Sequence, residues 1–581
     1  MAENQFDPKL GRIRDARRQR AERHAVRVFR QAGKQGARLL RHPRHVAPAS
    51  LRRGMGAGVR AAAGLIAPGS RRVIIKARYT RISAGDLGAA RAHIRYIVRD
   101  GVTREGETGR LYDAAGDNVD GATFLDRSGA DPHQFRFVVS ADEGARLTDL
   151  KPFIRNLMAQ MEHDLDTKLD WVAVDHFNTG HPHTHIVIRG RDDKGKDLVM
   201  ARDYIAHGVR ARAQALVTLE LGPETELERV HKLFNEVAQE RLTRLDRSLL
   251  ARAKESVLVV TSAQESDPTQ RALRIGRLKT LEKLGLAEER QRGVWTLDRS
   301  LEPKLRRLGE RADKFKMMQR ALAEAGIDRG AAAMALFERG PRKTPLIGKV
   351  VGIGMIDEIT DRTWVVIDAI DGRAHYAELG RLRSAEVPVR GEVVALAGEL
   401  VAGKPSSITK LQVLSPVPVE QQTSYEGPTW IDQAMIAKWR PDPDVAGFGA
   451  ELRRAFAARL HWLQQRQLAQ PIEHNSPELG ATPDMMRSLR QRETQRLVTA
   501  VSRDLGATYV PHAPGTRIGG IYERAITTPT GRLAVIRGED TFTLAPWKPA
   551  LESLRGQRVI GMVGPTRVTW AIDRGRTLPG R

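Results

Sequence analysis

The sequence predicts an α+β protein of several domains, with helices packed on a mainly antiparallel sheet in its first folded part. At 581 residues the chain is too long for one hydrophobic core. Between residues 71 and 222, segments rich in β-branched and aromatic residues alternate with segments of helical period. A β-hairpin in this stretch places neighbouring strands antiparallel, and together these features favour a layered α+β sandwich.

Local patterns give the elements of this first part. Leu150, Ile154, Leu157 and Met161 recur at helical spacing, whereas HQFRFVVS over 133–140 has the composition of a strand. Asp86 is a candidate N-cap for a helix that runs from there to Asp100. The predicted order is a strand over 71–80, a helix over 86–100, a loop over 104–131, a strand over 133–140, a helix over 147–165, a hairpin over 171–188 and a helix over 201–221.

The rest of the chain divides by composition. We expect a basic, mostly disordered arm over 1–70, a folded domain over 71–222, a helical region over 223–340, a small β-barrel-like domain over 345–415, a helical region over 428–500 and a mixed β-rich region with a basic tail over 507–581. Within 223–340, a helix is followed by a hairpin that turns at Arg292 and Gly293. This pattern is typical of a winged helix that binds DNA, and a helical connector with a β tail is the alternative.

Composition excludes several classes of function. The chain has no cysteine, so disulfides, iron–sulfur clusters and thiolate zinc sites are excluded, and a reducing cytoplasm is the expected location. No apolar run approaches the ~20 residues of a membrane span, and the N-terminus has no secretory core. The net charge is +25, and residues 1–70 hold 16 Lys/Arg against 4 Asp/Glu, a local charge of +12. A basic arm of this kind suits nucleic acid first and an anionic membrane surface second.

A histidine-rich hairpin is the most informative segment. The run WVAVDHFNTGHPHTHIVIRG over 171–190 has two apolar strands around a polar turn. His183 and His185 are two residues apart and share a face, and a turn near Thr179 and Gly180 places His176 opposite His183. Three imidazoles then converge, as in a metal site with nitrogen ligands. The alternative is an exposed polar turn, and we expect His181 to be exposed in this way.

The helix predicted over 86–100 carries a candidate nucleophile. Its apolar stripe consists of Leu87, Ala90, Ile94 and Ile97, and Tyr96 projects away from that stripe at about 100° per residue. Because the chain has no cysteine, the nucleophile of a covalent mechanism would be water, Ser, Thr, Tyr or Lys. His93 lies one turn before Tyr96. A surface tyrosine with a solvated hydroxyl is the alternative interpretation.

Two of these segments resemble a known family. HFNTGHPHTHIVIRG, preceded by HIRYIVRDG, is similar to the tyrosine relaxases of plasmid mobilisation, within the HUH endonuclease superfamily. The long chain further resembles relaxase/mobilisation nuclease proteins with a C-terminal domain of unknown function. Two positions depart from the family pattern. Thr184 stands between His183 and His185 where a hydrophobic residue is expected, and Asn178 stands where many relaxases have an acidic residue.

The resemblance implies a mechanism for the 71–222 domain. Tyr96 would be the catalytic nucleophile that nicks one strand at a plasmid transfer origin and forms a 5′-phosphotyrosyl link. His176, His183 and His185 would bind a divalent metal, Mg²⁺ or Mn²⁺ first and Zn²⁺ second. Supporting residues would be Asn178, Asp175, His181 and His93, although Asp175 is expected on the opposite face of its strand from His176.

The resemblance also implies partners. These are single-stranded DNA at the transfer origin, a type IV secretion system and accessory DNA-binding proteins, and the enzyme would act in a bacterial cytoplasm and be exported with the DNA. Two other functions stay open. HPHTH matches the spacing of histidine-triad nucleotide phosphohydrolases, in which His183 would be the nucleophile. The other is a non-catalytic DNA-binding accessory protein of mobilisation.

Overall fold

The computed structural model describes the chain in two compact units. The described residues are all except 1–68, 83–86, 100–101, 178–181, 339–343, 358–361, 382–386, 401–406, 440–445, 472–478, 482–484, 565–567 and 573–581. The units are Met1–Arg311 and Ala312–Arg581, and each is described by itself. The predicted disordered arm over 1–70 and the predicted basic tail therefore lie almost entirely outside the described residues.

The first unit contains a four-stranded antiparallel sheet. Its strands are β1 (Val73–Arg81), β2 (His133–Ala141), β3 (Trp171–His176) and β4 (His183–Arg189), in the order β1-β2-β4-β3. All three pairings are antiparallel. These strands lie within two residues of the predicted ones, because β-branched and aromatic side chains pack well on a pleated, buried surface.

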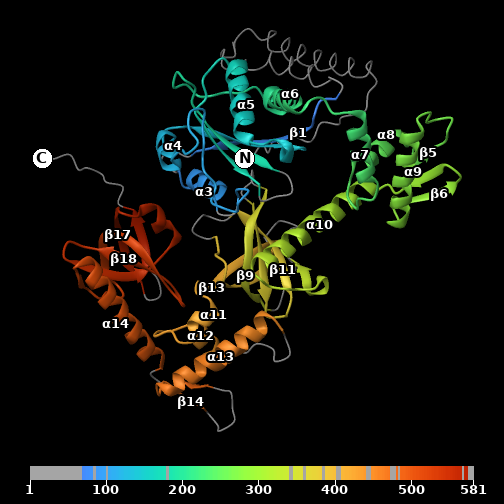
Figure 1. Ribbon diagram of the computed structural model, residues 1–581. Helices are drawn as coiled ribbons and strands as arrows, with labels where there is room; N and C mark the ends of the chain where they lie inside the picture. Colours follow the sequence, from blue (N-terminus) through green and yellow to red (C-terminus); the bar gives the residue numbers. More distant parts are fainter. Residues whose placement is uncertain are drawn as a thin grey trace. The chain divides into compact units, whose positions relative to one another are not determined.

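Helices cover both faces of this sheet (Figure 1). On one face lie α5 (Leu150–Leu165) and α6 (Val209–Leu221), whose apolar residues join Ile75, Phe137 and Trp171 in one core cluster. On the other face lie α3 (Gly88–Ile97) and α4 (Gly121–Arg127), which pack on Val172, Val174 and Val187. The predicted α+β sandwich is confirmed.

The predicted helices differ from the observed ones at their ends. The apolar positions chosen for α5 are buried, and Asp149 caps this helix by accepting from the backbone N–H of Lys151. In contrast, α3 spans ten residues where fifteen were expected, with Leu87 at its N-cap position; Asp86 lies outside the described residues. The loop predicted over 104–131 contains α4, whose N-cap Asp120 accepts from Ala122 and Thr123. A short π-helix (Tyr204–Gly208) precedes α6.

The segment after α6 has the outline expected of a winged helix. Its elements are α7 (Glu226–Val237), α8 (Arg244–Arg252), β5 (Val257–Val259), α9 (Pro268–Lys283), β6 (Ala287–Gln291), β7 (Val294–Leu297) and α10 (Leu301–Glu324). Strands β5, β7 and β6 form a three-stranded sheet, and Gly293 has φ of +79° in the turn between β6 and β7. A residue with φ in this region is most easily a glycine.

The arginines of α9 are used for packing within this segment. Arg277 is fully buried, donates to both carboxylate oxygens of Asp246 at 2.7 and 2.8 Å, and donates to the backbone carbonyls of Val237 and Arg241 at 3.0 Å each. Arg274 forms an ion pair with Glu265. A recognition helix needs its basic groups on the surface, so the buried arginines of α9 do not add to the winged-helix interpretation.

The second unit begins within α10, and its first sheet has six strands. The strands are β8 (Met334–Leu336), β9 (Leu346–Asp357), β10 (Arg362–Ala369), β11 (Ala374–Arg381), β12 (Val393–Leu400) and β13 (Ser407–Ser415), in the order β13-β12-β9-β10-β11-β8. Strand β9 pairs with both β10 and β12, and β11 comes close to β13. Among the described residues this sheet is not closed into a barrel, so an open sheet stands where a small barrel-like domain was expected.

The remainder of the second unit is helical and then β-rich. The helices are α11 (Val419–Gln422), α12 (Trp430–Ile436), α13 (Phe448–Gln465) and α14 (Met485–Leu505), and the strands are β14 (Ala469–Pro471), β15 (Leu479–Ala481), β16 (Thr508–Tyr509), β17 (Arg517–Thr528), β18 (Gly531–Arg537), β19 (Thr541–Pro546), β20 (Arg558–Val563) and β21 (Val568–Ile572). Strands β16 to β21 form one sheet in the order β16-β19-β18-β17-β20-β21. No helix in the described part of the chain is both long and apolar enough to cross a membrane.

Candidate metal centre

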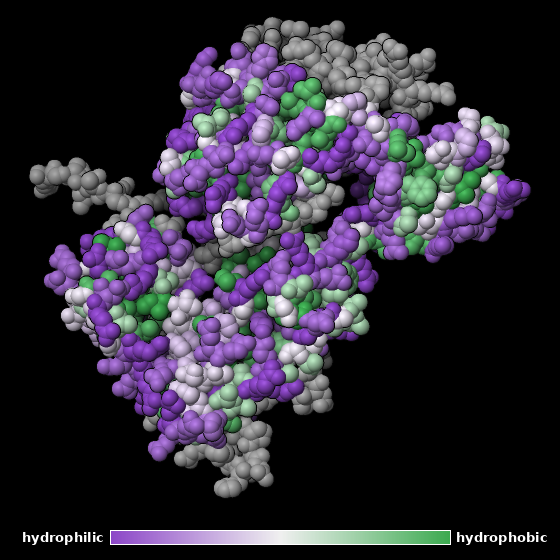
Figure 2. Space-filling model, in the orientation of Figure 1, coloured by the Kyte–Doolittle hydropathy of each residue, from purple (hydrophilic) through white to green (hydrophobic). Residues whose placement is uncertain are grey.

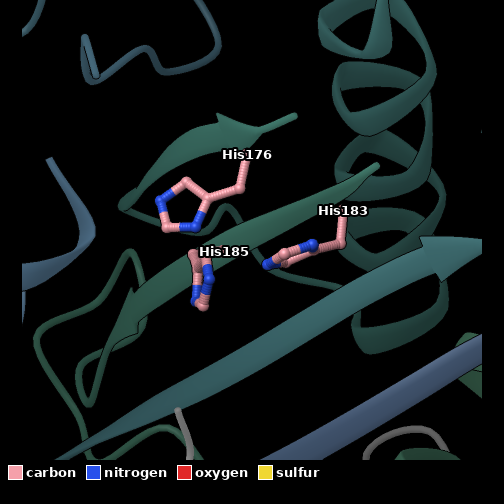
Figure 3. A group of neighbouring side chains, drawn as sticks. All are labelled: His176, His183 and His185. Atoms are coloured by element: carbon pink, nitrogen blue, oxygen red, sulfur yellow. The ribbon is translucent and has the colours of Figure 1, made fainter. Parts of the chain in front are cut away.

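Three histidines of the β3–β4 hairpin converge on one point. His176 pairs with His183 in the register of the two strands, and His185 follows on the same face. The ring centroids are 4.4 Å (His176–His185), 5.1 Å (His183–His185) and 5.2 Å (His176–His183) apart. All three side chains are buried, and one nitrogen from each lies within 4.8 Å of the others. Figure 3 shows the rings pointing toward one another, so the group can hold a divalent metal ion.

The protonation state of His176 follows from its surroundings. Its Nε2 lies 2.6 Å from the backbone carbonyl oxygen of Ile97. A carbonyl only accepts, so Nε2 carries the proton and the lone pair of the neutral ring is on Nδ1. Burial, the neighbouring His185 and Arg99 lower the pKa of His176 to about 2. The ring is therefore neutral at ordinary pH and ready to bind a metal through Nδ1.

The other face of the hairpin is held by a carboxylate. The hydroxyl of Thr184 donates to Asp175 Oδ1 at 2.6 Å, and the hydroxyl of Tyr112 donates to the same oxygen at 2.9 Å. Asp175 therefore points away from the three histidines, as expected from its position next to His176. It contacts Thr184 and Tyr112 there, on the side covered by α5, and so it supports the site through the strands.

Replacement of Asp175 by asparagine is expected to stabilise the protein at about pH 8 and to have little effect near pH 4. Burial raises the pKa of Asp175 from 3.8 to about 6, so the folded state loses stability as the pH rises through that interval and the carboxyl group ionises. The asparagine oxygen can still accept from Tyr112 and Thr184 without carrying charge. We expect a gain of about 1–3 kcal/mol in the free energy of unfolding. Urea denaturation at both pH values measures it, and an equal gain at both would contradict the assigned cause.

Tyr96 belongs to the helix whose end contacts His176. It occupies the last turn of α3, immediately before Ile97, whose carbonyl contacts His176. The side chain of Tyr96 is half-buried and packs against the α3 core cluster, so it is closer to the apolar face than the helical wheel predicts. The guanidinium of Arg99 lies 4.1 Å from the centroid of the Tyr96 ring and donates to the Tyr96 carbonyl at 3.2 Å. Arg99 belongs to the segment HIRYIVRDG that resembles the relaxases, but its contact with the Tyr96 ring was not predicted.

Two other tyrosines are less suited to the same task. Tyr112 is fully buried and bonded to Asp175 on the opposite face of the sheet, and burial raises its pKa well above 10.0. Tyr79 is half-exposed on β1 and its ring lies 4.6 Å from that of His133. Tyr79 pairs with Phe135 in the register of β1 and β2, and Phe135 belongs to the core on the α5 face of the sheet. Tyr79 therefore lies on the face opposite the three histidines.

The remaining candidate residues divide into two groups. His93 is buried on α3, one turn before Ile97. Asn178 and His181 belong to the turn between β3 and β4, and they lie outside the described residues. The structure therefore brings His176, His183 and His185 together and places Tyr96, His93 and Arg99 on the adjoining helix and its end.

A family comparison covers the other part of the chain. The family described as "Protein of unknown function (DUF3363)" matches residues 274–409 and 401–579. These segments together span more than half of the 581 residues. The chain belongs to the DUF3363 family. The matched DUF3363 region begins within α9 and ends after β21, whereas the histidine centre lies before it.

Two further comparisons give no match. No curated protein and no solved structure is significantly similar to this DUF3363 protein.

Proposed function

We propose that this protein is a metal-dependent DNA relaxase that nicks one strand at a plasmid transfer origin. The observation that carries the proposal is a hydrogen bond between the segment of the candidate nucleophile and the candidate metal site. The ring of His176, in the three-histidine group, donates to the backbone carbonyl of Ile97, the residue after Tyr96. A nucleophile and a metal must both reach the same phosphate, and this contact keeps the helix end and the hairpin together. The motif resemblance supplies the reaction class.

The proposed reaction is a transesterification. The phenolic oxygen of Tyr96 attacks the scissile phosphorus, forming a tyrosyl P–O bond to the 5′ side of the DNA. The phenol gives up its proton, the P–O3′ bond breaks, and the 3′ oxygen takes up a proton to leave as a hydroxyl group, so there is no net change in protons. One phosphoester replaces another, so the step needs no nucleotide cofactor, and reversal rejoins the strand. Arg99 places a permanent positive charge beside Tyr96, where the phosphodiester would approach.

His176, His183 and His185 would hold the metal. A divalent ion bound there supplies a Lewis acid for the non-bridging phosphate oxygens. Three buried neutral imidazoles fit Zn²⁺ by ligand softness, and they also accept Mn²⁺ or Mg²⁺ when phosphate and water oxygens complete the shell. We favour Mg²⁺ or Mn²⁺ because the substrate brings oxygen ligands of its own.

The test of the proposal is nicking of a supercoiled plasmid that carries the transfer origin. We expect a relaxed product in Mn²⁺ or Mg²⁺, no product in EDTA, and a covalent DNA adduct that maps to Tyr96. A phosphohistidine on His183 would instead identify a nucleotide phosphohydrolase of the histidine-triad type. Salt-sensitive binding without any nicking would leave a non-catalytic accessory protein. Export with the DNA through a type IV secretion system is the biological role we propose for the adduct.

Deletion of residues 1–65 is expected to weaken DNA binding and to flatten its salt dependence. Residues 1–70 carry a net charge of +12. The magnitude of the negative slope of log K against log salt falls by about 0.7–0.9 for every phosphate that the shortened protein no longer neutralises. Fluorescence anisotropy of labelled DNA over a range of NaCl concentrations measures the slope. An unchanged slope would mean that the arm does not bind phosphates.

A further inference from the structure

A stripe of arginines runs along α14 in the DUF3363 region. It consists of Arg492, Arg496 and Arg503, with Gln495 and Thr499 between them, and all five side chains are exposed. Their spacing of four, three and four residues from Arg492 through Thr499 to Arg503 keeps them on one side of a helix. The buried side of α14 is formed by Met485, Leu489, Glu493, Leu497 and Val501. Figure 2 shows the region of α14 as mainly hydrophilic.

Within the described residues, neither acidic residue of α14 forms an ion pair with an arginine of the stripe, although the charge of Glu493 acts on Arg496. Glu493 is on the buried side and accepts a hydrogen bond from the hydroxyl of Tyr425 at 2.8 Å. Asp504 forms an ion pair with Arg524 at 2.5 Å. Within the described residues, neither Arg492 nor Arg503 has an ion pair or a hydrogen bond from its side chain. The guanidinium of Arg496 is held 4.7 Å from the centroid of the Tyr425 ring, a contact that orients it without cancelling its charge.

On another exposed helix of the same chain, two arginines have an acidic partner one turn away. On α10, Arg306 pairs with Glu302 and Arg320 pairs with Glu324, each four residues apart. On α14 the residues four apart are Arg492 and Arg496, and such like-charge pairs destabilise a helix by about 0.2–0.5 kcal/mol. Its first turn has no acidic residue and contains Arg487, which opposes the helix dipole. A bound polyanion would remove both of these costs.

The chemistry of the stripe points to one kind of polyanion. All the basic residues of α14 are arginines, and the planar guanidinium group matches phosphate with two parallel hydrogen bonds. The stripe from Arg492 to Arg503 is about 16 Å long at 1.5 Å per residue. One strand of duplex DNA presents a phosphate about every 3.4 Å along its axis. The amide of Gln495 adds a neutral donor of the type that contacts phosphate oxygens, whereas the hydroxyl of Thr499 donates to the Gln495 carbonyl at 2.9 Å.

We propose that the outer face of α14 binds the sugar–phosphate backbone of nucleic acid without regard to sequence. This surface lies in the family region to which no function is attached, outside the histidine centre. It would give the protein a second hold on a nucleic acid, independent of cleavage by the first unit. The +25 net charge of the chain is consistent with such a partner.

The experiment compares two full-length variants that each lose two positive charges with a third that keeps them. The double variant R492Q/R503Q removes two guanidinium groups that form no ion pair or hydrogen bond within the described residues, so folding should be unaffected. R306Q/R320Q removes two charges from the exposed face of α10 and is the matched control. R492K/R503K keeps the charge. The probe is a labelled random-sequence oligonucleotide without a transfer origin, in EDTA, as single strand and as duplex in separate arms, so that the result does not depend on nicking.

We expect R492Q/R503Q to make the salt dependence shallower. The magnitude of the negative slope of log K against log salt should fall by about 1.4–1.8, the value for two phosphates that are no longer neutralised. The lysine variant should keep the slope, and the α10 control should match the unaltered protein. An unchanged slope for R492Q/R503Q, or an equal decrease in the control, would overturn the proposal. A loss of binding to phosphatidylserine vesicles with DNA binding intact would overturn it in favour of a membrane surface.

Discussion

Replacement of Tyr96 by phenylalanine is expected to abolish strand cleavage and to leave DNA binding unchanged. The change removes only the phenolic oxygen, so the packing of the ring against the α3 cluster and the contact with Arg99 should persist. Loss of a nucleophile typically lowers a rate by roughly 10⁴- to 10⁶-fold. Nicking of supercoiled origin plasmid measures the rate, and anisotropy on an uncleavable oligonucleotide measures binding.

The matched control for this experiment is Tyr79→Phe. Tyr79 is half-exposed on β1, so its hydroxyl can be removed with little effect on the fold. Tyr112→Phe is a poorer control because it removes a buried hydrogen bond to Asp175, which costs about 1–3 kcal/mol of stability. A tyrosyl–DNA adduct that survives in Tyr96→Phe would disprove our assignment and direct attention to Tyr79 and Tyr112.

Replacement of His183 by alanine should lower metal affinity and nicking activity together. His183 supplies one of three nitrogens from a buried group, and two imidazoles hold a divalent ion much less firmly than three. Because loss of a supporting residue alone costs roughly 10- to 100-fold in affinity, we expect loss of a ligand to exceed about 100-fold. Calorimetric titration with Mn²⁺ and with Zn²⁺ measures the affinity.

The control for His183 is His231→Ala. His231 is exposed on α7, so its removal tests for adventitious binding by a surface imidazole. The free energy of unfolding of the metal-free His183→Ala variant should also be measured, since a buried side chain is removed. Unchanged metal affinity in a folded His183→Ala protein would refute the ligand assignment.

The hairpin geometry could be predicted from the sequence because a strand has a period of two. His183 and His185 must share a face, and a short turn fixes which residue of the first strand lies opposite. The observed register pairs His176 with His183 and turns Asp175 and Thr184 to the other side. Periodicity also explains why α5 was placed correctly, because its apolar residues recur at helical spacing along one face.

Other features depend on contacts between distant segments and could not be predicted in this way. The bond from His176 to the Ile97 carbonyl joins residues 79 apart, and no local pattern encodes it. Tyr96 is half-buried because its ring packs against the core cluster of α3 and lies under the guanidinium of Arg99. The burial of Arg277 depends on Asp246 and on the carbonyl of Val237 in another helix, and no local pattern indicates it.

The carbonyl of Ile97 has a consequence for the local dynamics of the protein. It belongs to the end of α3, where Val98 and Arg99 make the last backbone bonds to Ile94 and Tyr96. If this turn frays, His176 loses the acceptor that selects its tautomer, and its proton can move to the nitrogen that faces the cluster. Order at the helix end and occupancy of the histidine cluster should therefore reinforce each other, so that an ion slows amide exchange some distance from its own ligands.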